Sequence, residues 1–172
     1  PIPGPKDDFL FKFLGKGTVF GIPFQVILFA IVVIILWIIL NKTPFGRKVY
    51  AVGGNEKASF ISGINIDKVK IWVYIISALM AVLSGLVLTS RLNSAQPTAG
   101  TAYEMDAIAA VVLGGTSMSG GSGSLTGTLI GILILGVLNN GLNLLGVSSF
   151  YQQIVKGIVI LVAVLIDRKR NK

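Results

Sequence analysis

The sequence predicts an all-α polytopic membrane protein with about five transmembrane helices, one of them short and broken, and a further helix in a cytoplasmic loop. Two observations predict this class. The 172 residues are 53% apolar and 13% charged, with a mean hydropathy of +0.81, whereas soluble domains carry about 25% charged residues. Apolar runs also recur along the chain, close to the length that a helix needs to cross a hydrocarbon core of about 30 Å. Residues 1–172 are therefore predicted to form a single membrane domain.

Four apolar runs are predicted to be spans. The first covers about residues 22–40, where Gln25 is the only polar residue between Phe24 and Leu40. At 1.5 Å per residue, the run 24–40 makes about 25 Å of helix, so the two residues before it are included. The other three cover about residues 71–88, 125–147 and 151–166. Lys156 lies near one end of the fourth run, where its ammonium group is able to snorkel to the membrane surface.

A short apolar piece at about residues 105–118 is the least certain crossing by length alone. Its seven apolar residues, 107–113, make only about 10 Å of helix, and a Gly/Ser-rich stretch, 114–124, follows them. Irregular backbone at membrane depth is tolerated only when it is buried in protein or lines a wet cavity. We therefore expect this broken element near a helix interface or a solute path.

The distribution of Lys and Arg favours a crossing by this short piece. Outside the spans, six cations lie in 41–70, three in 1–22, one in 89–106 and four in the C-terminal tail. Four crossings would leave six cations inside and eight outside, whereas five crossings place ten inside and four outside. The positive-inside rule favours five. The N-terminus is then external, residues 41–70 form a cytoplasmic loop, and the C-terminus is cytoplasmic.

Composition also excludes several kinds of chemistry. The chain has no Cys and no His, so disulfides, thiolate catalysis and His-based metal sites or triads are excluded, and we expect no enzyme activity, metal or cofactor. The net charge of +8 lies largely in two cytoplasmic segments, so it indicates membrane orientation and not a nucleic-acid partner. The four clear spans carry no acidic residue. If the chain moves a solute, its energy source is expected on another subunit.

Neutral polar residues on the span 125–147 form the first candidate site. Gly136, Asn139 and Asn143 share one helical face, and Asn140 lies to one side. One interpretation is interhelical hydrogen bonding beside a groove of small residues such as Gly127-xxx-Gly131. The other is a solute path, because uncharged amides suit hydroxyl-rich solutes.

The external segment 91–106 is the second candidate. It carries the polar residues Gln96, Glu104 and Asp106. The segment is interpreted either as a solvated connector or as a surface where an external partner docks or a solute is admitted.

A short helix is predicted in the cytoplasmic loop, at residues 55–62. Gly53 and Gly54 precede it, and Gly63 follows at a natural C-terminal cap position. Its Lys residues and Phe60 are compatible with an interfacial anchor. Because no energy source is found in the chain itself, a docking helix for a cytoplasmic partner is the favoured interpretation.

Four runs in order carry a resemblance to a known family. The run GRKVYAVGGNEKASFISGIN (46–65) resembles the cytoplasmic loop of bacterial monosaccharide ABC importer permeases. The runs SAQPTAG (94–100), YEMDAIAAVVLGGTS (103–117) and LNNGLNLLGVSS (138–149) resemble the ribose-type members in particular. The resemblance covers essentially the whole chain. Full-length permeases begin with additional spans, so the chain resembles their C-terminal half.

The resemblance implies a multi-pass permease subunit of the bacterial inner membrane that moves a monosaccharide, with ribose as the first candidate, by alternating access. It implies cytoplasmic ATP-binding cassette subunits as partners, a second permease copy in a homodimer, and an extracytoplasmic sugar-binding protein. The residues that it places at the ATPase-coupling helix are Gly53, Gly54, Asn55, Glu56, Ala58 and Gly63. The alternative is a truncated membrane remnant or scaffold that does not transport.

Overall fold

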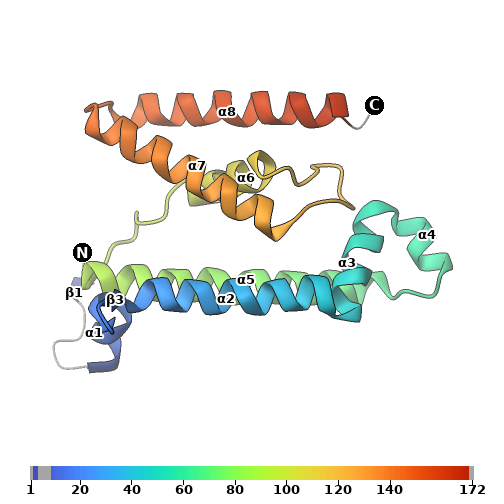
Figure 1. Cartoon of the computed structure of the whole chain (residues 1–172), viewed down its shortest axis with the longest axis horizontal. Coiled ribbons are helices and arrows are strands. Elements are labelled where there is room, and N and C mark those ends of the chain that lie inside the picture. The colour runs from blue at the N-terminus through green and yellow to red at the C-terminus, as the bar shows by residue number, and fades with distance from the viewer. Residues whose placement is uncertain (1, 4–8, 171–172) are drawn as a thin grey trace. The chain divides into compact units, whose positions relative to one another are not determined.

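The computed structural model describes residues 2–3 and 9–170, and it is almost entirely helical (Figure 1). The all-α prediction is confirmed. Lys6 and Lys172, which contribute to the charge count, lie outside the described residues. In chain order the elements are β1 (Ile2–Pro3), α1 (Phe9–Lys16), β2 (Thr18–Val19), β3 (Ile22–Pro23), α2 (Phe24–Lys42), α3 (Pro44–Gly54), α4 (Glu56–Ile61), α5 (Ile66–Leu92), β4 (Ser94–Ala95), α6 (Tyr103–Leu113), α7 (Leu125–Leu144) and α8 (Ser149–Arg170).

The chain divides into two compact units. The first unit consists of residues 1–49 and 57–101, and the second unit of residues 50–56 and 102–172. The second unit thus includes the C-terminal end of α3 together with α6, α7 and α8. The strands are minor: β1 pairs with β4 and β2 with β3, both antiparallel, within the first unit.

Three of the described helices, α2, α5 and α7, are long and apolar enough to cross a membrane, and α8 contains a shorter apolar stretch, Phe150–Val162. Their large side chains are largely unburied; Ile34 is 57% exposed and Leu133 is 68% exposed. Such surfaces are unfavourable in water and favourable against lipid. The chain is therefore a multi-pass membrane protein. The 11 residues of α6 make only about 16 Å of helix.

Helix α1 was not predicted from the sequence, and it fastens one end of the first unit. It packs on α5 and on α2. The Ser90 hydroxyl of α5 donates a hydrogen bond to the Phe11 carbonyl, and the Gln25 side-chain amide donates to the Gly15 carbonyl at 2.6 Å. A Cβ at Gly15 would lie 2.4 Å from Ser90 atoms, so only glycine allows this approach. The one polar residue of the first apolar run therefore has a structural role.

Helix α3 was not predicted either, because residues 44–54 were assigned only to the cytoplasmic loop 41–70. Thr43 ends α2 and begins α3: its hydroxyl donates to the Ile39 carbonyl at 2.5 Å and accepts from the Gly46 amide at 3.4 Å. Pro44 follows as the first helical residue, where its missing N–H costs nothing. The Thr-Pro pair was the available signal for a helix start at this point.

The second unit has its core where α6 meets α7 and α8. Ala109 and Ala110 of α6 are buried with Leu135 of α7. A Cβ at Gly131 would lie 2.0 Å from the Ala110 carbonyl oxygen, and a Cβ at Gly127 would lie equally close to the Gly114 oxygen. The predicted Gly127-xxx-Gly131 groove is thus confirmed as the surface on which α6 packs. Figure 1 shows α6 against α7 and α8 returning antiparallel to α7.

Candidate functional site

Helix α4 confirms the helix predicted at residues 55–62, and its C-terminal end is tightly formed. Gly63 adopts φ +79°, a conformation that side chains with a Cβ rarely adopt. The Gly63 amide donates to the Phe60 carbonyl at 2.9 Å and the Ile64 amide donates to the Ser59 carbonyl at 3.0 Å, which together form a Schellman motif. Asn65 then caps α5, because its side-chain oxygen accepts from the Lys68 amide at 3.0 Å.

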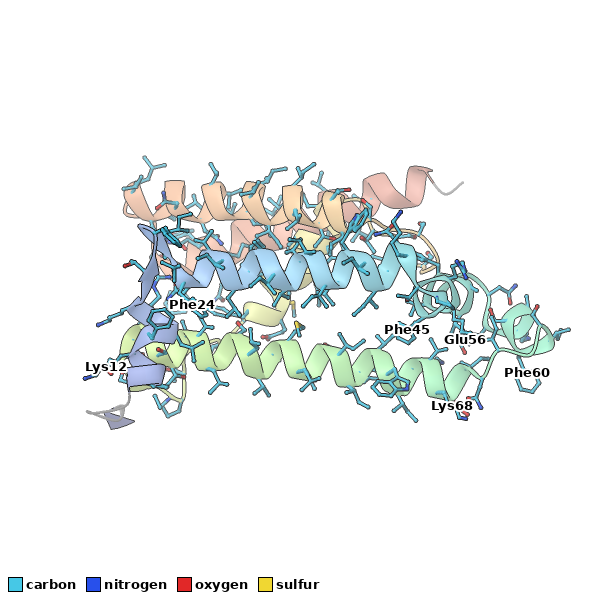
Figure 2. All side chains as sticks on the ribbon, turned by 60° about the horizontal axis from the view of Figure 1, so that its bottom comes forward. Lys12, Phe24, Phe45, Glu56, Phe60 and Lys68 are labelled. Carbon is cyan, nitrogen blue, oxygen red and sulfur yellow. The ribbon has the colours of Figure 1, made fainter. Side chains whose placement is uncertain are left out.

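The side chains of α4 divide into a buried and an exposed set. Ser59 is buried, whereas Phe60 is 71% exposed and Ile61 is 85% exposed. Figure 2 shows Phe60 at the outer tip of α4, pointing away from α5. Two large apolar side chains are thus exposed at the end of a helix that begins with the acidic Glu56. We refer to Phe60 and Ile61 as the α4 tip.

The six residues expected at the coupling helix occupy three kinds of position. Gly53 and Gly54 end α3, Asn55 lies between the two helices, and Glu56 and Ala58 lie in α4. Gly63 follows α4 as its left-handed cap. The segment is therefore a helix-turn-helix and not one isolated helix.

The polar residues of α7 differ in the contacts that they make. Asn143 makes an interhelical contact, because its side-chain oxygen accepts from the Gln152 amide of α8 at 2.9 Å. The same Gln152 amide donates to the Val147 carbonyl at 2.8 Å and so fastens the turn between α7 and α8. Asn140 is exposed, and the Asn139 side-chain oxygen is buried with no hydrogen-bond partner among the described residues. The Asn139 oxygen is therefore a buried acceptor that lacks a donor among the described residues, which is rare in folded proteins.

Gly136 differs from the two glycines that lie earlier on α7. A Cβ at this position would meet nothing within 4 Å. It is exposed and takes no part in packing against α6. Gly136 therefore lies on the same helix as the polar residues, with open space where a side chain would be.

An ion pair joins α6 to α8, and the sequence did not predict it. The Lys156 ammonium nitrogen lies 2.7 Å and 2.9 Å from the two carboxylate oxygens of Asp106. The side chains are 19% and 29% exposed. Lys156 therefore does not snorkel as predicted, because its charge is neutralised inside the second unit. The available signal was a lone lysine in otherwise uncharged spans, since such a group needs a counter-ion.

The three polar residues expected in the external segment lie in different elements. Glu104 and Asp106 lie in the first turn of α6, which begins at Tyr103, and only Gln96 lies in the connection between β4 and α6. Acidic side chains stabilise the first turn of a helix, which accounts for the positions of Glu104 and Asp106.

Residues 4–164 match the family described as branched-chain amino acid transport system, permease component. The chain belongs to this permease family. The ribose import permease protein of Bacillus subtilis (strain 168) is 61% identical to the permease chain over 171 residues, which are 99% of this chain and 53% of that protein. The xylose transport system permease protein of Haemophilus influenzae is 45% identical over 88% of the chain and 40% of its own length. The L-arabinose transport system permease protein of Escherichia coli (strain K12) is 41% identical over 98% and 51%.

The permease chain spans about half the length of the curated relatives that it matches, and the match to the ribose permeases falls in their C-terminal half. No solved structure matches the chain.

Proposed function

We propose that the chain is part of the membrane permease of an ATP-binding cassette importer that carries a monosaccharide into a bacterial cell, with ribose as the substrate. The observation that carries this proposal is the 61% identity with a ribose import permease over 99% of the chain. Identity with the xylose and L-arabinose permeases is 45% and 41%. The higher identity with the ribose permease favours ribose as the substrate over xylose and L-arabinose.

The α4 tip is the proposed seat for a cytoplasmic ATP-binding subunit. A partner cleft would bury Phe60 and Ile61, which the chain itself leaves 71% and 85% exposed. The Schellman motif at Gly63 and the Asn65 cap leave little freedom between α4 and α5. Displacement of α4 by ATP binding and hydrolysis would therefore move α5, which at 27 residues is about 40 Å long.

Contacts inside the second unit support the five-crossing topology. The Tyr50 hydroxyl donates to the Gly123 carbonyl at 3.1 Å, and a Cβ at Gly53 would lie 2.9 Å from the Gly121 amide nitrogen. The turn 114–124 is thus on the same side of the membrane as residues 50–56. With the loop 41–70 in the cytoplasm, α6 crosses from the external side, and α7 and α8 return the C-terminus to the cytoplasm.

The second unit offers a neutral environment for a sugar. The Lys156–Asp106 pair cancels the one cation of α8's apolar stretch, and the unsatisfied Asn139 oxygen supplies a hydrogen-bond acceptor. Uncharged donors and acceptors are what hydroxyl groups require. We place Asn139 at the solute path, with Asn140 and Gly136 beside it. Gln96 is assigned to the face that receives sugar from an extracytoplasmic binding protein, and a second permease copy completes the path.

Photo-crosslinking from the α4 tip tests this proposal. A photoreactive residue at Phe60 should crosslink to the ATP-binding subunit in membranes that also contain the sugar-binding protein. The same residue at Gln96, on the predicted external face, is the matched control and should not crosslink to it. A non-transporting scaffold would give no ATPase adduct at either position, and that result would reject the assignment.

A further inference from the structure

Two glycine pairs meet backbone to backbone in the second unit. Gly53 and Gly54 lie at the end of α3, and Gly120 and Gly121 lie in the turn between α6 and α7. A Cβ at Gly120 would lie 2.3 Å from the Gly53 oxygen, and a Cβ at Gly121 would lie 2.6 Å from the Gly54 Cα. A side chain at Gly120 or Gly121 would force these backbones apart, because the neighbouring atoms are main chain and cannot rotate away.

A second contact holds the same two segments together. The Tyr50 hydroxyl, one helical turn before Gly53, donates to the Gly123 carbonyl at 3.1 Å. Residues 50–56 consequently group with α6, α7 and α8. Two residues of α3 and three of the turn thus form a joint, which we define as Tyr50, Gly53, Gly120, Gly121 and Gly123.

Hydrogen bonds also connect the turn to the helices on both sides of it. Gly115 and Thr116 close α6 with a Schellman motif, donating to Val112 and Val111 at 2.9 Å and 3.1 Å. The Ser124 hydroxyl caps α7 by accepting from the Gly127 amide at 3.0 Å. A displacement of the turn therefore shifts the end of α6 and the start of α7 together.

We propose that the joint carries the displacement of α4 into the α6–α7 pair, so that the movement imposed by the ATP-binding subunit reaches the part of the chain that contains Asn139. This inference rests on the proposed function. Asn55 alone separates α3 from α4, so α4 cannot move far without moving the end of α3. Gly53 and Gly121 are positioning residues in this account, since neither contacts the solute.

Two alanine variants of helical glycines separate the joint from general stability. At Gly53 a Cβ would lie 2.9 Å from the Gly121 nitrogen, whereas at Gly157 of α8 it would meet nothing within 4 Å. Both positions are helical, so the gain in helix propensity is shared by the two variants. Gly157→Ala is therefore the matched control for Gly53→Ala.

The readout is the number of sugar molecules taken up per ATP hydrolysed, in proteoliposomes that contain an importer assembled with this chain. Gly53→Ala should lower this ratio by about ten-fold, in the range usual for coupling between sites, and Gly157→Ala should change it by less than about two-fold. A purely structural role would lower uptake and hydrolysis together and leave the ratio unchanged. Equal ratios in the two variants would overturn the proposal.

Tyr50→Phe provides the complementary measurement. It removes the hydroxyl that donates to the Gly123 carbonyl at 3.1 Å and adds no atom to the joint. We expect the number of sugar molecules taken up per ATP hydrolysed to fall by about five-fold; a ratio equal to that of the unmodified importer would contradict a joint that transmits the movement. If the unmodified importer shows no ATP-dependent uptake, the proposed function fails, whereas uptake with unchanged ratios in both Gly53→Ala and Tyr50→Phe would overturn the joint alone.

Discussion

Removing Lys156 should destabilise the second unit because it leaves a carboxylate without its counter-ion. The ammonium nitrogen lies 2.7 Å from the nearer Asp106 oxygen, and the two side chains are 19% and 29% exposed. Lys156→Met keeps the length and the apolar stem of the side chain but removes the charge. Asp106 then stays in the first turn of α6 without this counter-ion.

The size of the effect follows from two opposing terms. At an effective dielectric constant of about 20, unit charges 2.7 Å apart attract by about 6 kcal/mol. Much of this attraction offsets the cost of desolvating both groups, so the net loss on removing one partner is about 3 kcal/mol, at the lower end of the range for buried pairs. Asp106→Leu together with Lys156→Met removes both charges and should recover most of that loss.

Equilibrium unfolding in mixed detergent micelles measures these values. The two single variants and the double variant complete a cycle, and we expect a coupling energy of about 2 kcal/mol or more between the two positions. Strictly additive losses would refute the reasoning, because they would mean that Lys156 and Asp106 are each solvated independently.

Three further predictions concern packing and capping. Gly131→Ala places a Cβ 2.0 Å from an α6 carbonyl oxygen and should lower the free energy of unfolding by about 1–3 kcal/mol. Gly136→Ala places a Cβ with nothing within 4 Å and should leave the free energy of unfolding unchanged or raise it. The same unfolding titration compares the two variants. Asn143→Leu loses the Gln152 hydrogen bond and should cost about 0.6–1.7 kcal/mol, while Asn140→Leu, at an exposed position, should cost less in that titration. Gly63→Ala forces a Cβ residue to φ +79° and should cost about 1–2 kcal/mol locally, seen as faster amide exchange in α4 than in α5.

Composition and periodicity were sufficient for the membrane class and for α4. Apolar length alone indicated the runs that α2, α5 and α7 cover, because the cost of burying polar backbone leaves few alternatives to a helix in lipid. Gly63 marked the end of α4 because a left-handed cap favours glycine. These features depend on local chemistry, which a single sequence contains.

Features that depend on distant residues could not be predicted in this way. The acid that pairs with Lys156 lies 50 positions away, and only the packing of α6 on α8 brings the two together. The same applies to the close backbone contact between Gly53 and Gly121, which was not predicted. The helix α1 was missed for a related reason, since its eight residues are stabilised by contacts with α5 and α2 and not by a long amphipathic pattern.

Sugar uptake tests the central claim most directly. Proteoliposomes that contain an importer assembled with this chain, its ATP-binding subunit and its ribose-binding protein should accumulate labelled ribose when ATP is supplied, and vesicles without the chain should not. The account predicts that accumulation is lost when Phe60 and Ile61 are both replaced by Asp, because the α4 tip can no longer be buried in the ATP-binding subunit. Uptake that needs no ATP, or that persists unchanged in this double variant, would contradict it.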